Sequence, residues 1–369
     1  MNKNITIIIK SFNRPKYLLR ALKFIFLYDK SIPIIILDSS SIDFNNKELE
    51  NILKNKNIRF LKFPSDIFMV QKIYKGSMHI DTEYCVLCPD DDLILVNSLL
   101  ECINFLKKNT EYSSVQGHHF HHPSYEEVKK DGFNFYKLYE GGLSAEENDK
   151  FARIKKFLSG NTRYYPFYGV HRTSNFKIIW DITSRCVDDW ALSEYVPSIL
   201  SLSTGKMKIL PIVYMSRERH KTIFNLFNNL SYLSKKRVIK ASNEISNYIN
   251  TTDQIPIEHS LKILIKHFKE IRKKYYYKYY VIKINEIISF IPKFIRVFLK
   301  KFFKIKNFYN DKRYSYKISN ENYNEKDINN IKSIIITSQI PKKYLETNDS
   351  FRNLPNKVFN SKSKASLFK

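Results

Sequence analysis

Three consecutive carboxylates follow a short apolar run in the segment Tyr84 to Leu95, which reads Y-C-V-L-C-P-D-D-D-L-I-L. The apolar residues have the length and composition of a buried strand that stops at Pro89. Acids at the end of such a strand, here Asp90 to Asp92, repel one another, and a divalent cation bound by their oxygens would relieve the repulsion. An acidic cluster is also a common N-terminal cap, and a helix is predicted from Leu93 to Leu106. The tripeptide alone leaves both interpretations open.

Strands and helices are expected to alternate up to these acids. The predicted strands are Ile5 to Ile9, Ile34 to Leu37, Ile58 to Phe63 and Tyr84 to Leu87, and the predicted helices between them begin near Pro15, Lys47 and Asp66. This alternation favours an α/β fold whose sheet is wound by right-handed crossovers, with ligands outside the carboxyl ends of the strands. Polar residues follow three of the strands, at 11–14, 38–41 and 90–92. Their convergence on one edge favours the cation over the cap.

Three stretches together resemble the first half of glycosyltransferase family 2 over about residues 4 to 105. They read I-T-I-I-I-K-S-F-N-R-P-K-Y-L-L-R-A-L, I-I-I-L-D-S-S-S and Y-C-V-L-C-P-D-D-D-L-I. The resemblance implies the nucleotide-sugar-binding GT-A fold, a mostly parallel, Rossmann-like sheet flanked by helices.

The resemblance also implies how the donor nucleoside is bound. The first loop, with Ser11, Asn13 and Arg14, is expected to contact the nucleoside, and Asp38 to bond the pyrimidine. A carboxylate accepts the imide N–H of uracil, which cytosine lacks, so a UDP-sugar is the expected donor. The common family pattern has two acids after the second strand, whereas here Ser39 follows Asp38.

The acidic tripeptide matches the D-x-D element of the family. Asp90 and Asp92 are then expected to bind the ribose and a divalent metal, Mn²⁺ or Mg²⁺, with Asp91 between them at the donor. A metal ion on the diphosphate stabilises the charge that grows as the glycosidic bond breaks. His220, after the strand-like Ile209 to Met215, is a candidate third ligand because some GT-A enzymes use a late histidine.

A second acidic pair lies in the segment R-C-V-D-D-W-A-L-S-E. The resemblance implies that Asp189, or else Asp188, is the general base that takes the proton of the acceptor hydroxyl in an inverting transfer. The alternative for both is an N-terminal helix cap. Four histidines at positions 118, 119, 121 and 122 are interpreted as a surface loop or acceptor-site lining rather than a metal site.

Charge is distributed unevenly over the 369 residues, whose net charge is +26. Residues 1–220 hold 31 basic and 25 acidic side chains, whereas 221–369 hold 31 and 11. In Ile291 to Ile305, apolar and basic residues fall on opposite faces of a predicted helix, which is typical of a helix on an anionic membrane surface. Packing on the catalytic domain or dimerisation are the alternatives for it.

The expected organisation is a catalytic domain at 1–225, a basic helical region at 226–310 and a loosely ordered tail at 311–369. The donor half of the domain spans about 1–110 and the acceptor half about 111–225. A strand-like stretch is noted at Ile331 to Thr337. Four scattered cysteines are too few for a disulfide framework, and no apolar run reaches the ~18 to 20 residues of a membrane span.

These features predict a metal-dependent glycosyltransferase that moves a sugar to a glycan or lipid-linked acceptor in surface-polysaccharide synthesis. It is expected in the cytoplasm, peripheral at the inner face of the plasma membrane. The alternatives are a nucleotidyltransferase on a related fold, for which a Gly-rich phosphate loop is missing, and a non-catalytic basic protein that binds nucleic acid. Nucleic acid is not an expected partner.

Overall fold

A computed structural model describes residues 4–41, 44, 46–133, 136–137, 143–159, 165–190, 192–218, 235–254, 258, 260–270, 273 and 324–340. The strands are β1 (Ile5–Ser11), β2 (Ile34–Asp38), β3 (Ile58–Lys62), β4 (Tyr84–Pro89), β5 (Asp92–Ile94), β6 (Tyr112–His122), β7 (Tyr136–Lys137), β8 (Val170–Arg172) and β9 (Lys206–Glu218). The helices are α1 (Pro15–Phe26), α2 (Lys47–Leu53), α3 (Met69–Ser77), α4 (Val96–Lys108), α5 (Tyr125–Asp131), α6 (Lys150–Leu158), η1 (Pro166–Tyr168), α7 (Thr173–Cys186), α8 (Leu192–Thr204), α10 (Lys235–Asp253) and α13 (Glu325–Ser338).

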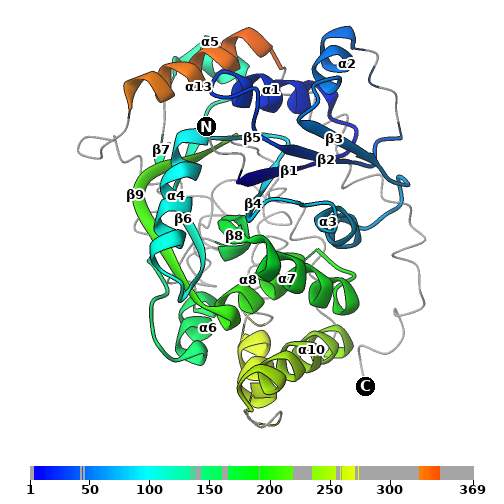
Figure 1. Cartoon of the computed structure of the whole chain (residues 1–369), viewed down its shortest axis with the longest axis vertical. Helices are drawn as coiled ribbons and strands as arrows, with labels where there is room; N and C mark the ends of the chain where they lie inside the picture. The colour runs from blue at the N-terminus through cyan, green and yellow to red at the C-terminus, as the bar shows by residue number, and fades with distance from the viewer. Residues whose placement is uncertain are drawn as a thin grey trace, which may run out of the picture.

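The described strands form one sheet in the order β3-β2-β1-β4-β8-β6-β9-β5, with β7 beside β6 (Figure 1). The first four are parallel, and the other half of the sheet is mixed. The register sets Ser11 opposite Asp38 and Lys10 opposite Pro89, so the carboxyl ends of β1, β2 and β4 lie side by side. The predicted α/β fold is confirmed.

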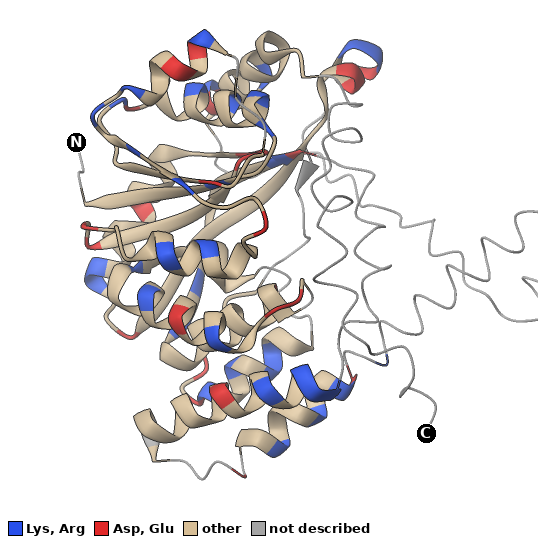
Figure 2. Cartoon of the chain, turned by 90° about the vertical axis from the view of Figure 1, so that its right-hand side faces the viewer, with Lys and Arg blue, Asp and Glu red and all other residues tan. Residues whose placement is uncertain are grey.

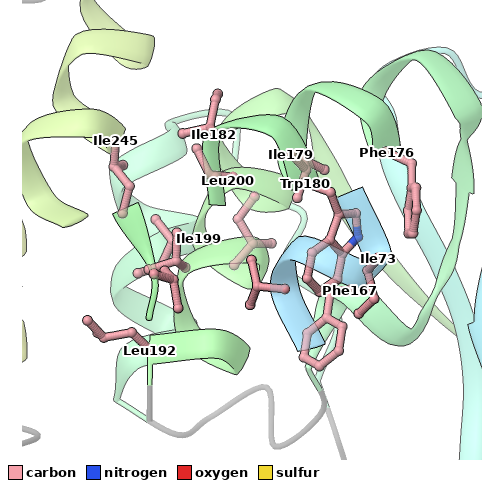
Figure 3. Close-up of a cluster of buried hydrophobic side chains, with 14 of the residues drawn as sticks. Ile73, Phe167, Phe176, Ile179, Trp180, Ile182, Leu192, Ile199, Leu200 and Ile245 are labelled. Carbon is pink, nitrogen blue, oxygen red and sulfur yellow. The ribbon is translucent and has the colours of Figure 1, made fainter. Parts of the chain in front are cut away.

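Helices cover both faces of the sheet. On β1, Ile8 belongs to a core shared with α3, α7 and α8, whereas Ile7 and Ile9 belong to a core shared with α1 and α4. Figure 3 shows the first core, in which Trp180 of α7 lies among Phe167 and other apolar side chains. Because successive residues of a strand face opposite sides, burial on both faces explains why the strand is an uninterrupted run of Ile.

The stretch Ile331 to Thr337 belongs to a helix, α13, and its predicted strand character is wrong. Ile331, Ile334 and Ile335 recur at helical spacing and are buried against Phe24, Leu95 and neighbouring apolar residues. Figure 1 shows α13 beside α1 and α5 at the top of the molecule. Part of the predicted tail is therefore packed on the catalytic domain.

A second helical region lies at the opposite end of the molecule. Helix α10 packs against α7 and α8 through Val238, Ala241, Ile245 and Ile249. Its outer face carries exposed lysines, and Figure 2 shows Lys and Arg positions recurring on the helices at this end. Within the described ranges, no helix has the length and apolar character needed to cross a bilayer. The predicted amphipathic helix at 291–305 lies outside these ranges.

The four histidines lie on β6 and not in a loop, which corrects the prediction for this segment. His119 and His122 are buried, and the strand pairs with β9 along most of its length. The strand was not predicted because polar residues stand at successive positions, although both of its faces are buried.

The close approach of α3 to β2 gives a prediction about stability. A Cβ atom added at Gly76 would lie 2.3 Å from Cδ2 of Leu37, which is fully buried. We expect Gly76→Ala to lower the free energy of unfolding by ~1 to 3 kcal/mol through overpacking, despite the better helix propensity of alanine. Chemical denaturation measures this. In a Leu37→Ala background the new methyl group has room, so an equal loss there would contradict the packing explanation.

Candidate active site

The loops after β1 and β2 are hydrogen-bonded to each other at the carboxyl edge of the sheet. The Ser39 N–H donates to the Ser11 carbonyl oxygen at 3.2 Å. Asn13, at φ 54°, donates its backbone N–H to Ser40 Oγ at 2.7 Å and accepts the Ser41 N–H on Oδ1 at 2.9 Å. Asparagine is one of the few residues that tolerate this left-handed conformation. Asn13 therefore joins the two loops and does not cap α1, where Arg14 is the N-cap residue.

Asp38 ends β2 with its side chain fully buried. Its Oδ1 accepts the Ser40 hydroxyl at 2.6 Å, and its Oδ2 accepts the Ser40 N–H at 3.1 Å and Lys62 Nζ at 2.6 Å. A carboxylate has about four acceptor positions, of which these donors use three. The predicted contact to a base is left with one.

Lys72 on α3 is a site residue that sequence reasoning missed. It is 4% exposed, and its Nζ donates to the Ser11 carbonyl oxygen at 2.9 Å and to Ser39 Oγ at 2.8 Å. Burial lowers its pKa from 10.5 to about 8, although nearby Asp38 opposes this. A lysine among the apolar positions of an amphipathic helix is the feature that would have indicated it.

Arg14 holds the first two acids of the tripeptide. Its Nη1 lies 3.1 Å from Asp90 Oδ1 and 3.1 Å from Asp91 Oδ2, while the Ser11 hydroxyl donates to Asp90 Oδ2 at 3.1 Å. Burial raises the pKa of the Asp90 carboxyl even though Arg14 favours its ionised form. Burial disfavours the charged Arg14, but Asp90 and Asp91 outweigh that effect and raise its pKa.

Asp92 belongs to β5 and pairs with Arg217 of β9, another residue that sequence reasoning missed. Arg217 Nε lies 3.0 Å from Asp92 Oδ2. Helix α4 starts at Val96 with Leu95 as its N-cap residue, and no side chain caps it. The cap interpretation of the acidic tripeptide is therefore wrong.

Arg20 of α1 is bonded to the backbone of the loop that carries the acidic tripeptide. Its Nη2 donates to the Asp91 carbonyl oxygen at 2.8 Å, and its Nη1 lies 2.5 Å from Oε2 of Glu218. Both side chains are buried, and Tyr17 also donates to Glu218, at 3.3 Å. A buried pair bonded in this way fixes the backbone next to Asp92.

The second acidic pair lies at the start of α8. Asp189 is 4% exposed and accepts the Leu192 N–H on Oδ1 at 2.9 Å, so the N-cap alternative describes its contact. Asp188 is exposed and lies 2.6 Å from Arg237 Nε. One turn later, Glu194 interacts electrostatically with Arg217 and Lys10, and burial raises the pKa of its carboxyl. Glu194 is a further acid that sequence reasoning missed, and it links this segment to residues at the carboxyl edge of the sheet.

No cluster of three potential metal ligands occurs among the described His, Cys, Asp and Glu residues. His220 lies outside the described ranges, so its role as a ligand stays a prediction. The buried His122 bonds Ser216 Oγ through Nδ1 at 2.8 Å, and its Nε2 is 3.8 Å from Glu218. The four cysteines are buried free thiols.

The sequence also matches a known protein family. Residues 6–173 match the family model described as glycosyl transferase family 2. These residues are a glycosyltransferase domain of the family 2 type. The match contains the three donor-edge loops and stops before Asp188 and Asp189. The match favours a glycosyltransferase over a nucleotidyltransferase, and it does not extend to the basic C-terminal third.

The glycosyltransferase also resembles solved structures of S. aureus TarS. Residues 1–349 of TarS share 12% identity with it at a TM-score of 0.49, with 71% of this chain and 69% of that chain covered. The TarS 1–349 complex with UDP-GlcNAc gives 13%, 0.49, 71% and 70% for the same quantities. No curated protein matches the chain. The family match, and not these structural similarities, identifies the enzyme.

The buried Lys72 predicts a pH dependence of stability. Its pKa is lower in the folded state than in the unfolded state, so the unfolded chain binds more protons between pH 8 and 10.5. The free energy of unfolding should therefore rise with pH in this window, by ~2 kcal/mol more in the wild type than in Lys72→Met. Urea denaturation at several pH values measures it. Parallel curves for the two proteins would show that the lysine titrates normally.

Proposed function

We propose that this enzyme uses a UDP-sugar and transfers the sugar with inversion to a glycan or lipid-linked acceptor in the synthesis of a bacterial-type surface polysaccharide. The observation that carries the proposal is the bonded edge of the sheet. There Ser11 joins the loop after β2 through its carbonyl oxygen and the loop after β4 through its hydroxyl. Three loops held in one arrangement form a preorganised surface for a nucleotide.

Asp38 is the residue proposed to bond the uracil base. The remaining acceptor position of its carboxylate suits the imide N–H, and cytosine offers no proton there. Lys62, which is about half exposed, covers this carboxylate and can move without disturbing the core. A base that enters here would displace Lys62 and meet the buried carboxylate of Asp38.

Asp92, with Asp90, would hold a divalent cation. The two residues fit such an ion in kind, because hard cations prefer carboxylate oxygens. A cation held there would supply positive charge to the leaving diphosphate. As placed, each carboxylate is paired with an arginine, so an incoming ion would have to compete with a guanidinium group.

Asp189 is the proposed general base. The acceptor oxygen attacks the anomeric carbon, its proton passes to the Asp189 carboxylate, and the bond to the diphosphate breaks with its electron pair on the departing oxygen. The cap bond uses Oδ1 of Asp189 and fixes the direction of the carboxylate. Attack from the face opposite the diphosphate inverts the anomeric centre.

Membrane association also belongs to the proposal. Its basis is the basic C-terminal third, of which the described part includes exposed Lys235, Lys236 and Lys240 on α10. The interfacial helix predicted at 291–305 lies outside the described residues. We propose a peripheral position on an anionic cytoplasmic membrane face, which flotation with anionic vesicles tests.

Nucleotide binding tests the donor. A nucleotide at a hundred times its dissociation constant should stabilise the protein by about 2.7 kcal/mol. We expect UDP to raise the unfolding midpoint more than CDP or GDP, with Mn²⁺ present, and Asp38→Asn to remove the preference for UDP. Thermal unfolding measures both effects. Asp81→Asn, at an exposed acid that pairs with Arg59 of β3, is the control; equal shifts by all three nucleotides would contradict the uracil contact.

Substitution of Asp189 tests the base. Asparagine is as good an N-cap as aspartate, so Asp189→Asn should keep the melting temperature while kcat falls by roughly 10²- to 10⁴-fold. Turnover is measured with the donor found in the nucleotide screen, and UDP affinity should be unchanged. Asp188→Asn, at the exposed neighbour, is the matched control. If Glu194→Gln loses turnover and Asp189→Asn does not, the base is Glu194.

A further inference from the structure

Arginines hold all three acids of the tripeptide, but the two arginines differ in how they are placed. Arg14 shares one nitrogen between Asp90 and Asp91. Arg217 instead lies with Nε 3.0 Å from Oδ2 of Asp92, as an ion pair without hydrogen-bond geometry. Asp92 is also the residue expected to bind a metal. The oxygen on which a cation would depend is therefore in contact with a guanidinium group.

The position of Arg217 is set by the fold. Strand β5 pairs antiparallel with β9, with Asp92 directly opposite Arg217. The guanidinium carbon lies 5.1 Å from the centroid of the Tyr168 ring, and the carbonyl oxygen of Tyr168 accepts the Tyr214 hydroxyl at 2.9 Å. Strand register and a stacked aromatic ring thus bring Arg217 to Asp92, unlike a long side chain that meets an acid by chance at the surface.

Burial makes a cation at Asp92 necessary. The Asp92 side chain is 3% exposed, whereas that of Arg217 is 26% exposed. A buried carboxylate without a positive partner is strongly destabilising, so some cation has to stay beside it. Two cations on the same oxygen repel each other at contact distance. Arg217 and a divalent ion are therefore alternatives at Asp92.

We propose that Arg217 competes with the divalent cation for Asp92, and that the donor diphosphate relieves the competition by drawing Arg217 onto its own oxygens. This inference rests on the proposed function for its nucleotide. Guanidinium groups match phosphate oxygens in geometry and stay charged at every physiological pH. Arg217 then couples the two ligands: the metal binds weakly alone and more tightly with the nucleotide, and each raises the affinity of the other by the same factor.

Electron paramagnetic resonance of Mn²⁺ tests the competition without any turnover. Full-length wild type and Arg217→Gln are titrated with Mn²⁺ in the absence of nucleotide. We expect the variant to bind Mn²⁺ about tenfold more tightly or better, since Asp92 loses its competing cation. Adding Asp92→Asn to the variant should remove the gain, which assigns the ion to this carboxylate. Arg59→Gln, at a partly exposed arginine of β3, should behave as wild type.

The nucleotide arm of the experiment measures the coupling. UDP should raise the Mn²⁺ affinity of the wild type by a larger factor than that of Arg217→Gln, because only the wild type has an arginine to displace. Circular dichroism checks that the variants fold. If Arg217→Gln does not fold, Arg217→Lys replaces it. Lysine keeps a positive charge but lacks the guanidinium group beside Asp92, so a smaller gain in affinity is expected.

Equal Mn²⁺ affinities of wild type and Arg217→Gln without nucleotide would overturn the proposal. A gain that survives Asp92→Asn would overturn it too, because the ion would then lie elsewhere. If the wild type binds no UDP under any condition, the proposed donor is wrong. The comparison without nucleotide separates that failure from a failure of the competition itself.

Discussion

Three carboxylates at the end of one buried strand are the constraint on which the site depends. Because β4 is buried along its whole length, Asp90 to Asp92 emerge into a poorly solvated position where mutual repulsion is strong. Arg14 neutralises them from the N-cap position of α1 and Arg217 from β9, two places far apart in the sequence. Folding of the donor edge therefore requires the first helix and the last described strand together.

Lys72 plays the corresponding part for the first two loops. A buried ammonium group is costly, and Lys72 compensates with bonds to the Ser11 carbonyl oxygen and Ser39 Oγ and with the nearby charge of Asp38. Since β1 and β2 are parallel neighbours, a donor beneath both can hold their ends in a fixed relation. Lys72 thus holds the loops after β1 and β2, whereas Arg14 and Arg217 hold the acids after β4.

The sequence was sufficient to predict the contacts that follow from strand order. Ser11, Asp38 and Asp90 come directly after apolar runs, and parallel strands must end at one edge, so their convergence needed no coordinates. Arg217 and Lys72 could not be found in this way. Arg217 reaches its partner through the register of β9 with β5, which local spacing does not encode. Lys72 is indicated in the sequence only by its place among the apolar positions of α3, and its partners follow from the rotation of that helix.

Errors in secondary structure have similarly local causes. Ile331 to Thr337 contains three consecutive isoleucines, which favour a strand by composition, but packing on α1 and α5 selects the helix that buries Ile331, Ile334 and Ile335. The alternative interpretation of the acids as a helix cap failed because β5, which begins at Asp92, separates Asp90 and Asp91 from α4. A three-residue strand has no periodicity that could reveal it, since only its pairing with β9 defines it.

The end of β9 shows how strongly charge can fix a register. Arg217 and Glu218 are consecutive, so their side chains point to opposite sides of the strand, one to Asp92 and the other to Arg20. Arg20 also bonds the Asp91 carbonyl oxygen, so both contacts act on the same loop. A slip of one residue would set Glu218 against Asp92 and Arg217 near Arg20, which replaces two attractions by two repulsions. The pairing that positions the donor acids is therefore specified by electrostatics at a point where the apolar pattern of β9 no longer specifies it.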